Sequence, residues 1–91
     1  MTYIHVTRTP DMHLSDYRRV VAALGEEPIA GRRRHYVGES DGALHTVDEW
    51  VSRADADRFA AERLFPAFDR AGVRPSPAMT LIAFEAGDGD D

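Results

Sequence analysis

The chain has 91 residues, no cysteine and a formal net charge of −5. This length predicts one domain, and the lack of cysteine excludes disulfides, thiolate zinc sites and a thiol nucleophile. The acidic balance argues against nucleic-acid binding, and no apolar run approaches the ~20 residues of a membrane span. Met1 leads directly into a strand-like run, so we expect no signal peptide and a cytoplasmic protein without membrane or nucleic-acid partners.

Alternating apolar and polar residues predict a first strand over residues 2–8, which Pro10 ends. A helix follows, capped by Asp11 or Ser15 and ended by Gly25. Its apolar stripe consists of Leu14, Tyr17, Val20, Val21 and Leu24. A strand over residues 32–38, a turn over 39–42 containing Asp-Gly and a strand over 44–50 predict a hairpin.

A second helix begins after Ser52, whose hydroxyl is three residues before Asp55, the spacing of a helix-capping box. Pro66 predicts a kink or break near residues 62–66, and Gly72 ends the helix. A fourth strand covers residues 78–85. Residues 87–91 form an acidic tail that we expect to be disordered, because it has nothing to bury.

The predicted order is β-α-β-β-α-β, which indicates a ferredoxin-like α+β domain over residues 1–86. In this fold both helices cover one face of a four-stranded antiparallel sheet, with the strands at 2–8 and 44–50 in its centre. The other face stays bare. A bare face that carries Trp50 needs a partner, so we predict a homodimer in which two sheets close face to face into an α+β barrel.

We assign Ile4, Val6 and Val47 to the helix-covered face, together with His45 and Tyr36. The opposite, partner-facing side then carries Tyr3, His5, Thr7, Thr46, Asp48 and Trp50.

The hairpin register decides which side chains of the strand at 32–38 join this face. A two-residue loop at Ser40-Asp41 pairs His35 with Thr46 and Arg33 with Asp48. A bulge at Gly42 would instead bring in Arg34 and Tyr36.

The run from Leu44 to Ser52, Leu-His-Thr-Val-Asp-Glu-Trp-Val-Ser, is followed by Arg53, Phe59, Arg63-Leu64 and Pro66. It resembles the antibiotic-biosynthesis-monooxygenase-like proteins of the dimeric α+β barrel superfamily, and His35 fits a histidine common in that group. The resemblance covers residues 3–85 and implies the barrel fold. It leaves the reaction open, because the superfamily includes cofactor-free oxygenases, haem degraders, polyketide cyclases and isomerases.

The partner-facing side carries side chains that could abstract a proton from a phenol or enol without a cofactor. We assign His35, His5 and Asp48 as catalytic residues, because a histidine takes up protons near neutral pH and a carboxylate can orient it. The candidate substrate-binding residues are Trp50, Tyr3, Thr46 and Arg33. The expected partner is an aromatic or polyketide small molecule, which the enzyme oxygenates by a cofactor-independent monooxygenase reaction.

Three alternatives remain open from the sequence. The same base could drive a cyclisation or isomerisation of a polyketide, or the chain could be a dimeric binding or accessory protein without catalysis. In the plainest reading Trp50 packs a dimer core and Asp48 pairs with Arg33. A metal site of His5, His35 and Asp48 has no compact motif, so we assign no metal.

Overall fold

The computed structural model describes residues 2–87. In chain order, its elements are β1 (Thr2–Pro10), α1 (Leu14–Leu24), β2 (Arg32–Ser40), β3 (Ala43–Trp50), α2 (Arg53–Phe59), η1 (Ala60–Leu64), α3 (Phe65–Ala71) and β4 (Thr80–Ala86). The predicted acidic tail lies outside the described residues, except for Gly87. None of the helices in this part of the chain is long and apolar enough to cross a membrane.

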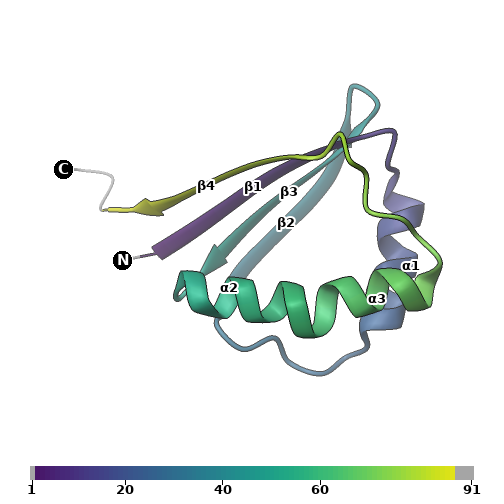
Figure 1. Cartoon of the computed structure of the whole chain (residues 1–91). Coiled ribbons are helices and arrows are strands. Elements are labelled where there is room, and N and C mark those ends of the chain that lie inside the picture. The colour runs from purple at the N-terminus through teal and green to yellow at the C-terminus, as the bar shows by residue number, and fades with distance from the viewer. Residues whose placement is uncertain (1, 88–91) are drawn as a thin grey trace.

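The four strands form one antiparallel sheet in the order β2-β3-β1-β4. β1 and β3 lie in the centre, as predicted, and β4 is an edge strand. The helices all lie on the same side of the sheet (Figure 1). The predicted ferredoxin-like topology is therefore confirmed.

A tight turn at Asp41 and Gly42 joins β2 to β3. Both residues have positive φ, 52° and 73°, which is the backbone that matches the twist of a two-residue hairpin. Ser40 consequently pairs with Ala43, and the predicted Ser40-Asp41 loop is wrong by one position. Because the loop moves by one residue, each residue of β2 from Arg34 onward pairs with a residue of β3 two positions away from the predicted one. A shift of two positions changes the pairing partners but leaves each side chain on its face.

The start of α1 differs from the prediction. Asp11 has φ 62° and belongs to the connection from β1, while His13 is the N-cap residue in extended backbone. The His13 backbone N–H donates to Asp16 Oδ2 at 3.1 Å, and Glu39 from β2 accepts from the Leu14 N–H. The caps predicted at Asp11 and Ser15 are both wrong, because a side chain from a neighbouring strand supplies part of the cap.

The second helix begins as predicted, with the Asp55 backbone N–H donating to Ser52 Oγ at 3.2 Å. The irregularity expected from Pro66 takes the form of the π-helical turn η1. There the Phe65 N–H donates to the Ala60 carbonyl, five residues back, so α2, η1 and α3 continue as one helix. Gly72 ends it in the left-handed conformation.

The main apolar cluster lies between the sheet and α2. Trp50 is only 1% exposed and packs against Ala56 and Phe59, with the Trp50 and Phe59 ring centroids 5.4 Å apart. The indole is therefore covered by the helix of its own chain. The assignment of Trp50, His5, Thr46 and Asp48 to the face away from the helices is wrong.

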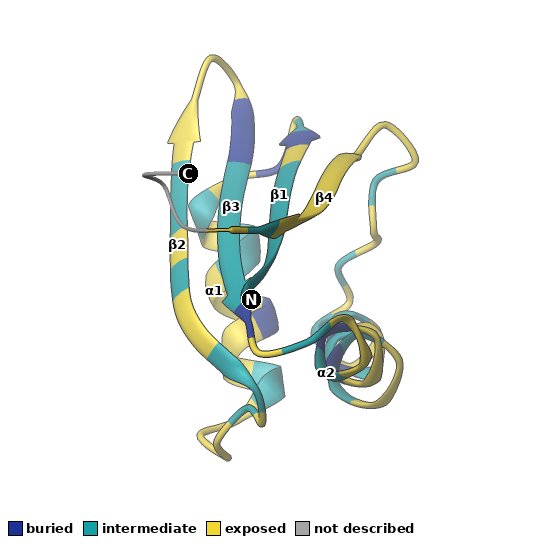
Figure 2. Cartoon of the chain, turned by 90° about the vertical axis from the view of Figure 1, so that its left-hand side faces the viewer, coloured by how far each residue is buried: buried dark blue, intermediate teal, exposed yellow. Residues whose placement is uncertain are grey.

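The face away from the helices is the apolar one. The strand pairings put Val6 beside Val47 and Ile82, Ile4 beside Phe84, and Tyr36 beside Val47. His45 lies on this outer face too, and its assignment with Tyr36 and Val47 to the helix side is wrong. Figure 2 shows β4 exposed along most of its length, and Ile82 is 63% exposed. We call Ile4, Val6, Val47, Ile82 and Phe84 the outer apolar face.

Two arginines of the long helix hold the neighbouring chain segments. Arg63 donates to the backbone carbonyls of Pro28 and Glu27 at 2.8 and 2.9 Å, and Arg70 donates to the Ala23 carbonyl at 2.9 Å. These bonds satisfy carbonyls at the end of α1 and in the connection to β2. They fix the loop that leads into the site described below.

We predict that Arg63→Ala lowers the free energy of unfolding by about 1–3 kcal/mol, because two charge-assisted hydrogen bonds are lost. The matched control is Arg53→Ala, since Arg53 is 75% exposed and pairs only with Asp57 at 3.6 Å. We expect the control to change stability by less than about 0.5 kcal/mol. Urea unfolding followed by circular dichroism measures both, and equal effects would contradict the proposed role of Arg63.

Candidate functional site

A cavity of about 790 Å³ lies between the sheet and the helices. Its size falls in the range of small-molecule sites. The inward side chains of β1, β2 and β3 form a polar wall, while apolar side chains from α1, the long helix and β4 form most of the remainder. Leu81, Met79 and Phe65 line the cavity and are also exposed, so its rim is apolar.

Asp48 lies between two histidines. In the sheet, β3 is flanked by β1 and β2, and Asp48 pairs with His5 on one side and His35 on the other. All three side chains line the cavity. The structure therefore brings the three predicted catalytic residues together, on the helix-covered face of the sheet.

His35 is held at both ring nitrogens. Its Nδ1 is hydrogen-bonded to Asp48 Oδ1, and its Nε2 to the hydroxyl of Tyr17 from α1. The Tyr17 and His35 rings are close to parallel, with centroids 5.7 Å apart and an interplanar angle of 20°. Tyr17, His35 and Asp48 thus form a continuous chain of hydrogen bonds, which we call the inner chain.

The chemistry of the partners determines where the protons of the inner chain lie. An ionised carboxylate only accepts, so His35 Nδ1–H donates to Asp48. In the neutral ring Nε2 is then an acceptor, and the Tyr17 hydroxyl donates to it. Burial raises the pKa of Tyr17 above its usual range, with Asp48 adding to the rise and Arg32 opposing it, so the phenol stays protonated near neutral pH.

Tyr17 was predicted only as part of the apolar stripe of its helix. A tyrosine on such a stripe carries a hydroxyl that needs a hydrogen-bond partner when buried, and that was the available signal. The partner itself could not be identified, because it depends on how α1 crosses β2.

Arg32 occupies the position predicted for Arg33. An irregularity between Arg32 and Arg34 leaves one residue of β2 unpaired, so that Arg32 pairs with Trp50 and Arg34 with Glu49. Such a bulge reverses the alternation beyond it, and Arg33 consequently lies exposed. The predicted pairings of Arg33 with Asp48 and of His35 with Thr46 are wrong, and so is the alternative with a bulge at Gly42.

The Arg32 guanidinium combines a positive charge with an aromatic neighbour. Its Nη1 is 3.9 Å from Asp48 Oδ1, and its Cζ lies 5.6 Å from the centroid of the Phe59 ring. The side chain lines the cavity. It can therefore attract an anionic oxygen of a ligand.

Trp50 contributes an apolar wall to the cavity. Its Nε1–H is buried out of reach of water and has no acceptor among the described residues. An unsatisfied buried donor of this kind costs about 1–3 kcal/mol. The surface that Trp50 offers a ligand is therefore the apolar part of its indole.

The other predicted binding residues differ in position. Thr46 lines the cavity, and its hydroxyl is hydrogen-bonded to that of Thr7 across the central strands. Tyr3 packs against the Trp50 cluster but is not among the cavity-lining residues. The Tyr3 and His5 ring centroids are 5.0 Å apart in a T-shaped arrangement. Tyr3 therefore packs against His5 without facing the cavity.

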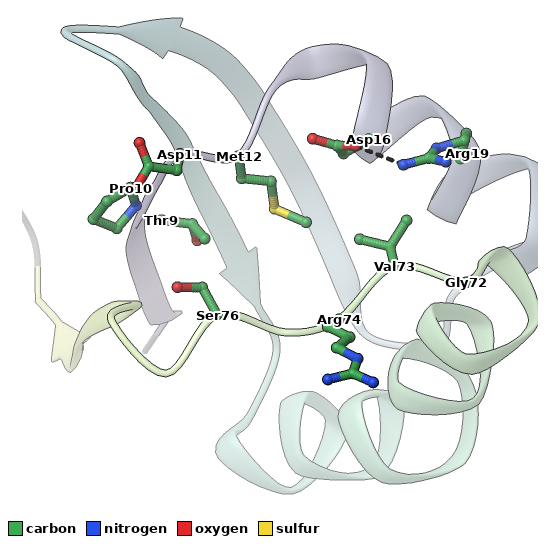
Figure 3. A pocket seen from close by; sticks show the side chains of 10 residues that line it. All are labelled: Thr9, Pro10, Asp11, Met12, Asp16, Arg19, Gly72, Val73, Arg74 and Ser76. Atoms are coloured by element: carbon green, nitrogen blue, oxygen red, sulfur yellow. Dashed lines mark hydrogen bonds and ion pairs between the residues drawn. The ribbon is translucent and has the colours of Figure 1, made fainter.

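A second hollow, of about 330 Å³, lies at the end of β1 beside α1 and the segment after α3 (Figure 3). Its charged residues are Asp11, Asp16, Arg19 and Arg74. Asp16 and Arg19 already pair at 2.6 Å, and the Arg74 guanidinium points away from them. Within residues 2–87, no group of three or more His, Asp or Glu side chains is arranged to hold a metal ion.

We predict that His5 reduces stability as the solution becomes acidic. Burial lowers its folded-state pKa below 6.5, and the charge of Asp48 opposes this only in part. Above pH 6.5 both the folded and unfolded states are neutral at His5. Below it the unfolded state binds the proton first, so stability falls until the lowered folded-state pKa is passed.

Melting temperatures of wild-type protein and His5→Asn across pH 8 to 5 measure this effect, with nuclear magnetic resonance titration of the imidazole as a direct check. The wild type should lose more stability than the variant on acidification. A His5 that titrates at or above 6.5 in the folded protein would contradict the prediction.

Comparison with known proteins identifies the fold. No protein-family model matches the sequence, and no curated protein matches it. Several solved structures match nearly the whole chain. SnoaB, a cofactor-independent oxygenase from Streptomyces nogalater solved in a variant form, is 16% identical with a TM-score of 0.67, covering 96% of this chain and 94% of that one.

A dimeric ferredoxin-like protein of unknown function from Jannaschia is 15% identical with a TM-score of 0.63, covering 94% and 100% of the two chains. A protein from Chloroflexus aurantiacus, proposed to be an antibiotic biosynthesis monooxygenase, is 12% identical with a TM-score of 0.61, covering 98% of each chain. At these identities the likeness concerns the fold. The chain has the ferredoxin-like α+β fold of the antibiotic-biosynthesis-monooxygenase-like proteins, as the resemblance predicted.

Proposed function

We propose that this protein is a cofactor-independent oxygenase that acts on a phenolic aromatic substrate in the cavity between sheet and helices. The observation that carries the proposal is the inner chain, which opens into that cavity. A histidine oriented by a carboxylate is a recurrent general base, and Asp48 stabilises the imidazolium that forms. The likeness of the fold to SnoaB supports this reaction type.

The reaction begins with loss of a proton from the substrate. An electron-rich phenol that loses its proton carries negative charge on its ring carbon as well as its oxygen, and this carbon can add to dioxygen. This addition gives a peroxide anion, which takes back the proton held by the base. The hydroperoxide then loses water, made from its outer O–H and the remaining hydrogen on the same carbon, and leaves a carbonyl. One oxygen atom enters the product and the other leaves as water, so the substrate itself supplies the electrons.

One group of the cavity wall suits the substrate anion. The Arg32 guanidinium lines the cavity and provides positive charge. Fixed donors aimed at the developing charge are a main source of rate enhancement in enzymes. The apolar lining from α1, the long helix and β4 suits the flat rings of the substrate.

We also propose that two copies pair through the outer apolar face. Ile82 and Phe84 are exposed there beside Ile4, Val6 and Val47, and no helix or strand within residues 2–87 covers them. An uncovered apolar sheet face is typical of a protein interface. The dimeric structure from Jannaschia with the same fold supports this arrangement. The predicted homodimer is thus retained, with a different set of residues at its centre.

We predict that the wild-type protein consumes dioxygen when dithranol, an anthrone whose enol tautomer has an acidic O–H, is supplied without added cofactor. His35→Gln should lower the rate by about 10²-fold or more, because the base is lost. His45→Gln is the matched control, since His45 lies on the outer face and bonds the Ser40 carbonyl at 3.2 Å. An oxygen electrode and product absorbance measure the rate.

The remaining candidate functions are outcomes of the same experiment. Turnover of a polyketide probe under anaerobic conditions would replace the oxygenase with a cyclase or isomerase. Saturable binding of dithranol without any turnover would make the protein a binder. Equal rates in His35→Gln and the control would remove His35 as the base.

For the dimer, we predict that wild-type protein has twice the chain mass in solution and that Ile82→Glu is monomeric. A glutamate within the proposed interface would have to be buried without a partner, which is costly. Val51→Glu is the matched control, because Val51 is an exposed apolar residue outside the sheet faces. Light scattering after size-exclusion chromatography gives the masses, and a monomeric wild type would contradict the proposal.

A further inference from the structure

His35 has no free ring nitrogen to offer a substrate. Asp48 occupies Nδ1, and the Tyr17 hydroxyl occupies Nε2. The side chain is only 20% exposed. A direct transfer from substrate to imidazole would first require Tyr17 to leave.

The Tyr17 hydroxyl, by contrast, is suited to meet the substrate. Tyr17 lines the cavity, and its hydroxyl donates its single hydrogen to His35. A hydroxyl oxygen has two lone pairs, so it can still accept a hydrogen bond from a ligand. The structure records no other hydrogen bond to this oxygen among the described residues.

We propose that Tyr17 is a catalytic residue that relays the substrate proton to His35. The substrate O–H donates to the Tyr17 oxygen. As this proton moves to Tyr17, the proton already on Tyr17 moves to His35 Nε2, so one O–H bond breaks at the substrate and one N–H bond forms at the imidazole. The products are a substrate anion, a neutral tyrosine and an imidazolium that donates to Asp48.

This relay needs no tyrosinate. Burial raises the pKa of Tyr17, so a stable tyrosine anion is disfavoured, and simultaneous transfer avoids it. The charge that appears is the imidazolium, which the Asp48 carboxylate stabilises from the opposite side. The inference rests on the proposed proton abstraction, and it narrows the substrate to one with an acidic O–H, namely a phenol or an enol.

The test uses 4-nitrophenol, whose phenolate is yellow, as a bound probe at a pH below its solution pKa. Wild-type protein should bind it partly as phenolate. Tyr17→Phe should still bind the probe, because the ring remains, but should lose the phenolate band and lower dithranol turnover by about 10²-fold. His35→Gln should lose the band as well. Tyr36→Phe is the matched control, because Tyr36 is 56% exposed on the outer face, and it should behave as wild type.

The opposite result is equally specific. If the Tyr17 hydroxyl only blocks His35 Nε2, removing the hydroxyl frees this nitrogen for the probe. Tyr17→Phe then keeps or strengthens the phenolate band. That outcome overturns the relay, as does wild-type protein that leaves 4-nitrophenol un-ionised. Unchanged melting temperatures ensure that a loss is not unfolding.

The two proposals can fail separately. Wild-type protein that ionises 4-nitrophenol through Tyr17 but consumes no dioxygen with dithranol supports the relay and contradicts the oxygenase. Dioxygen consumption that survives in Tyr17→Phe supports the oxygenase and overturns the relay.

Discussion

The pairing of His35 with Asp48 across β2 and β3 is the constraint on which the candidate site depends. The two-residue turn at Asp41 and Gly42 sets this register, because its positive φ values fit only a tight hairpin. A slip of one residue on one strand would turn His35 toward the other face of the sheet. The separate pairing of β1 with β3 places His5 on the other side of Asp48.

Burying such a polar row beneath helices is costly unless its groups are paired. The inner chain satisfies both nitrogens of His35, and Arg32 adds a positive charge beside Asp48. One donor in the same wall, the Trp50 Nε1–H, has no acceptor in the described residues. A few paired polar groups beside an otherwise apolar lining are typical of a small-molecule site, where they orient the ligand.

The two faces of the sheet have different roles in this interpretation. The inner face combines polar groups with a cavity, and the outer face carries aliphatic and aromatic side chains that no other part of the described structure covers. A dimer through the outer apolar face leaves the polar groups of the inner face buried. The cavity is lined by one chain, so its wall needs no residue from the second copy. The catalytic and assembly hypotheses therefore rest on separate surfaces.

The sequence by itself determined the order of the elements, the cap at Ser52, the irregularity near Pro66 and the helix end at Gly72, because each depends on neighbouring residues. With the two-residue hairpin loop it also grouped His5, His35 and Asp48 on one face, although the alternative of a bulge at Gly42 stayed open. Only the tertiary structure decided which face the helices cover. Alternation defines two faces, and here each carries large apolar residues, Trp50 and Leu44 on one and Ile4 and Val6 on the other. The bulge that exchanges Arg33 for Arg32 and the crossing of α1 that brings Tyr17 to His35 have the same origin, because both arise from contacts between segments distant in the chain.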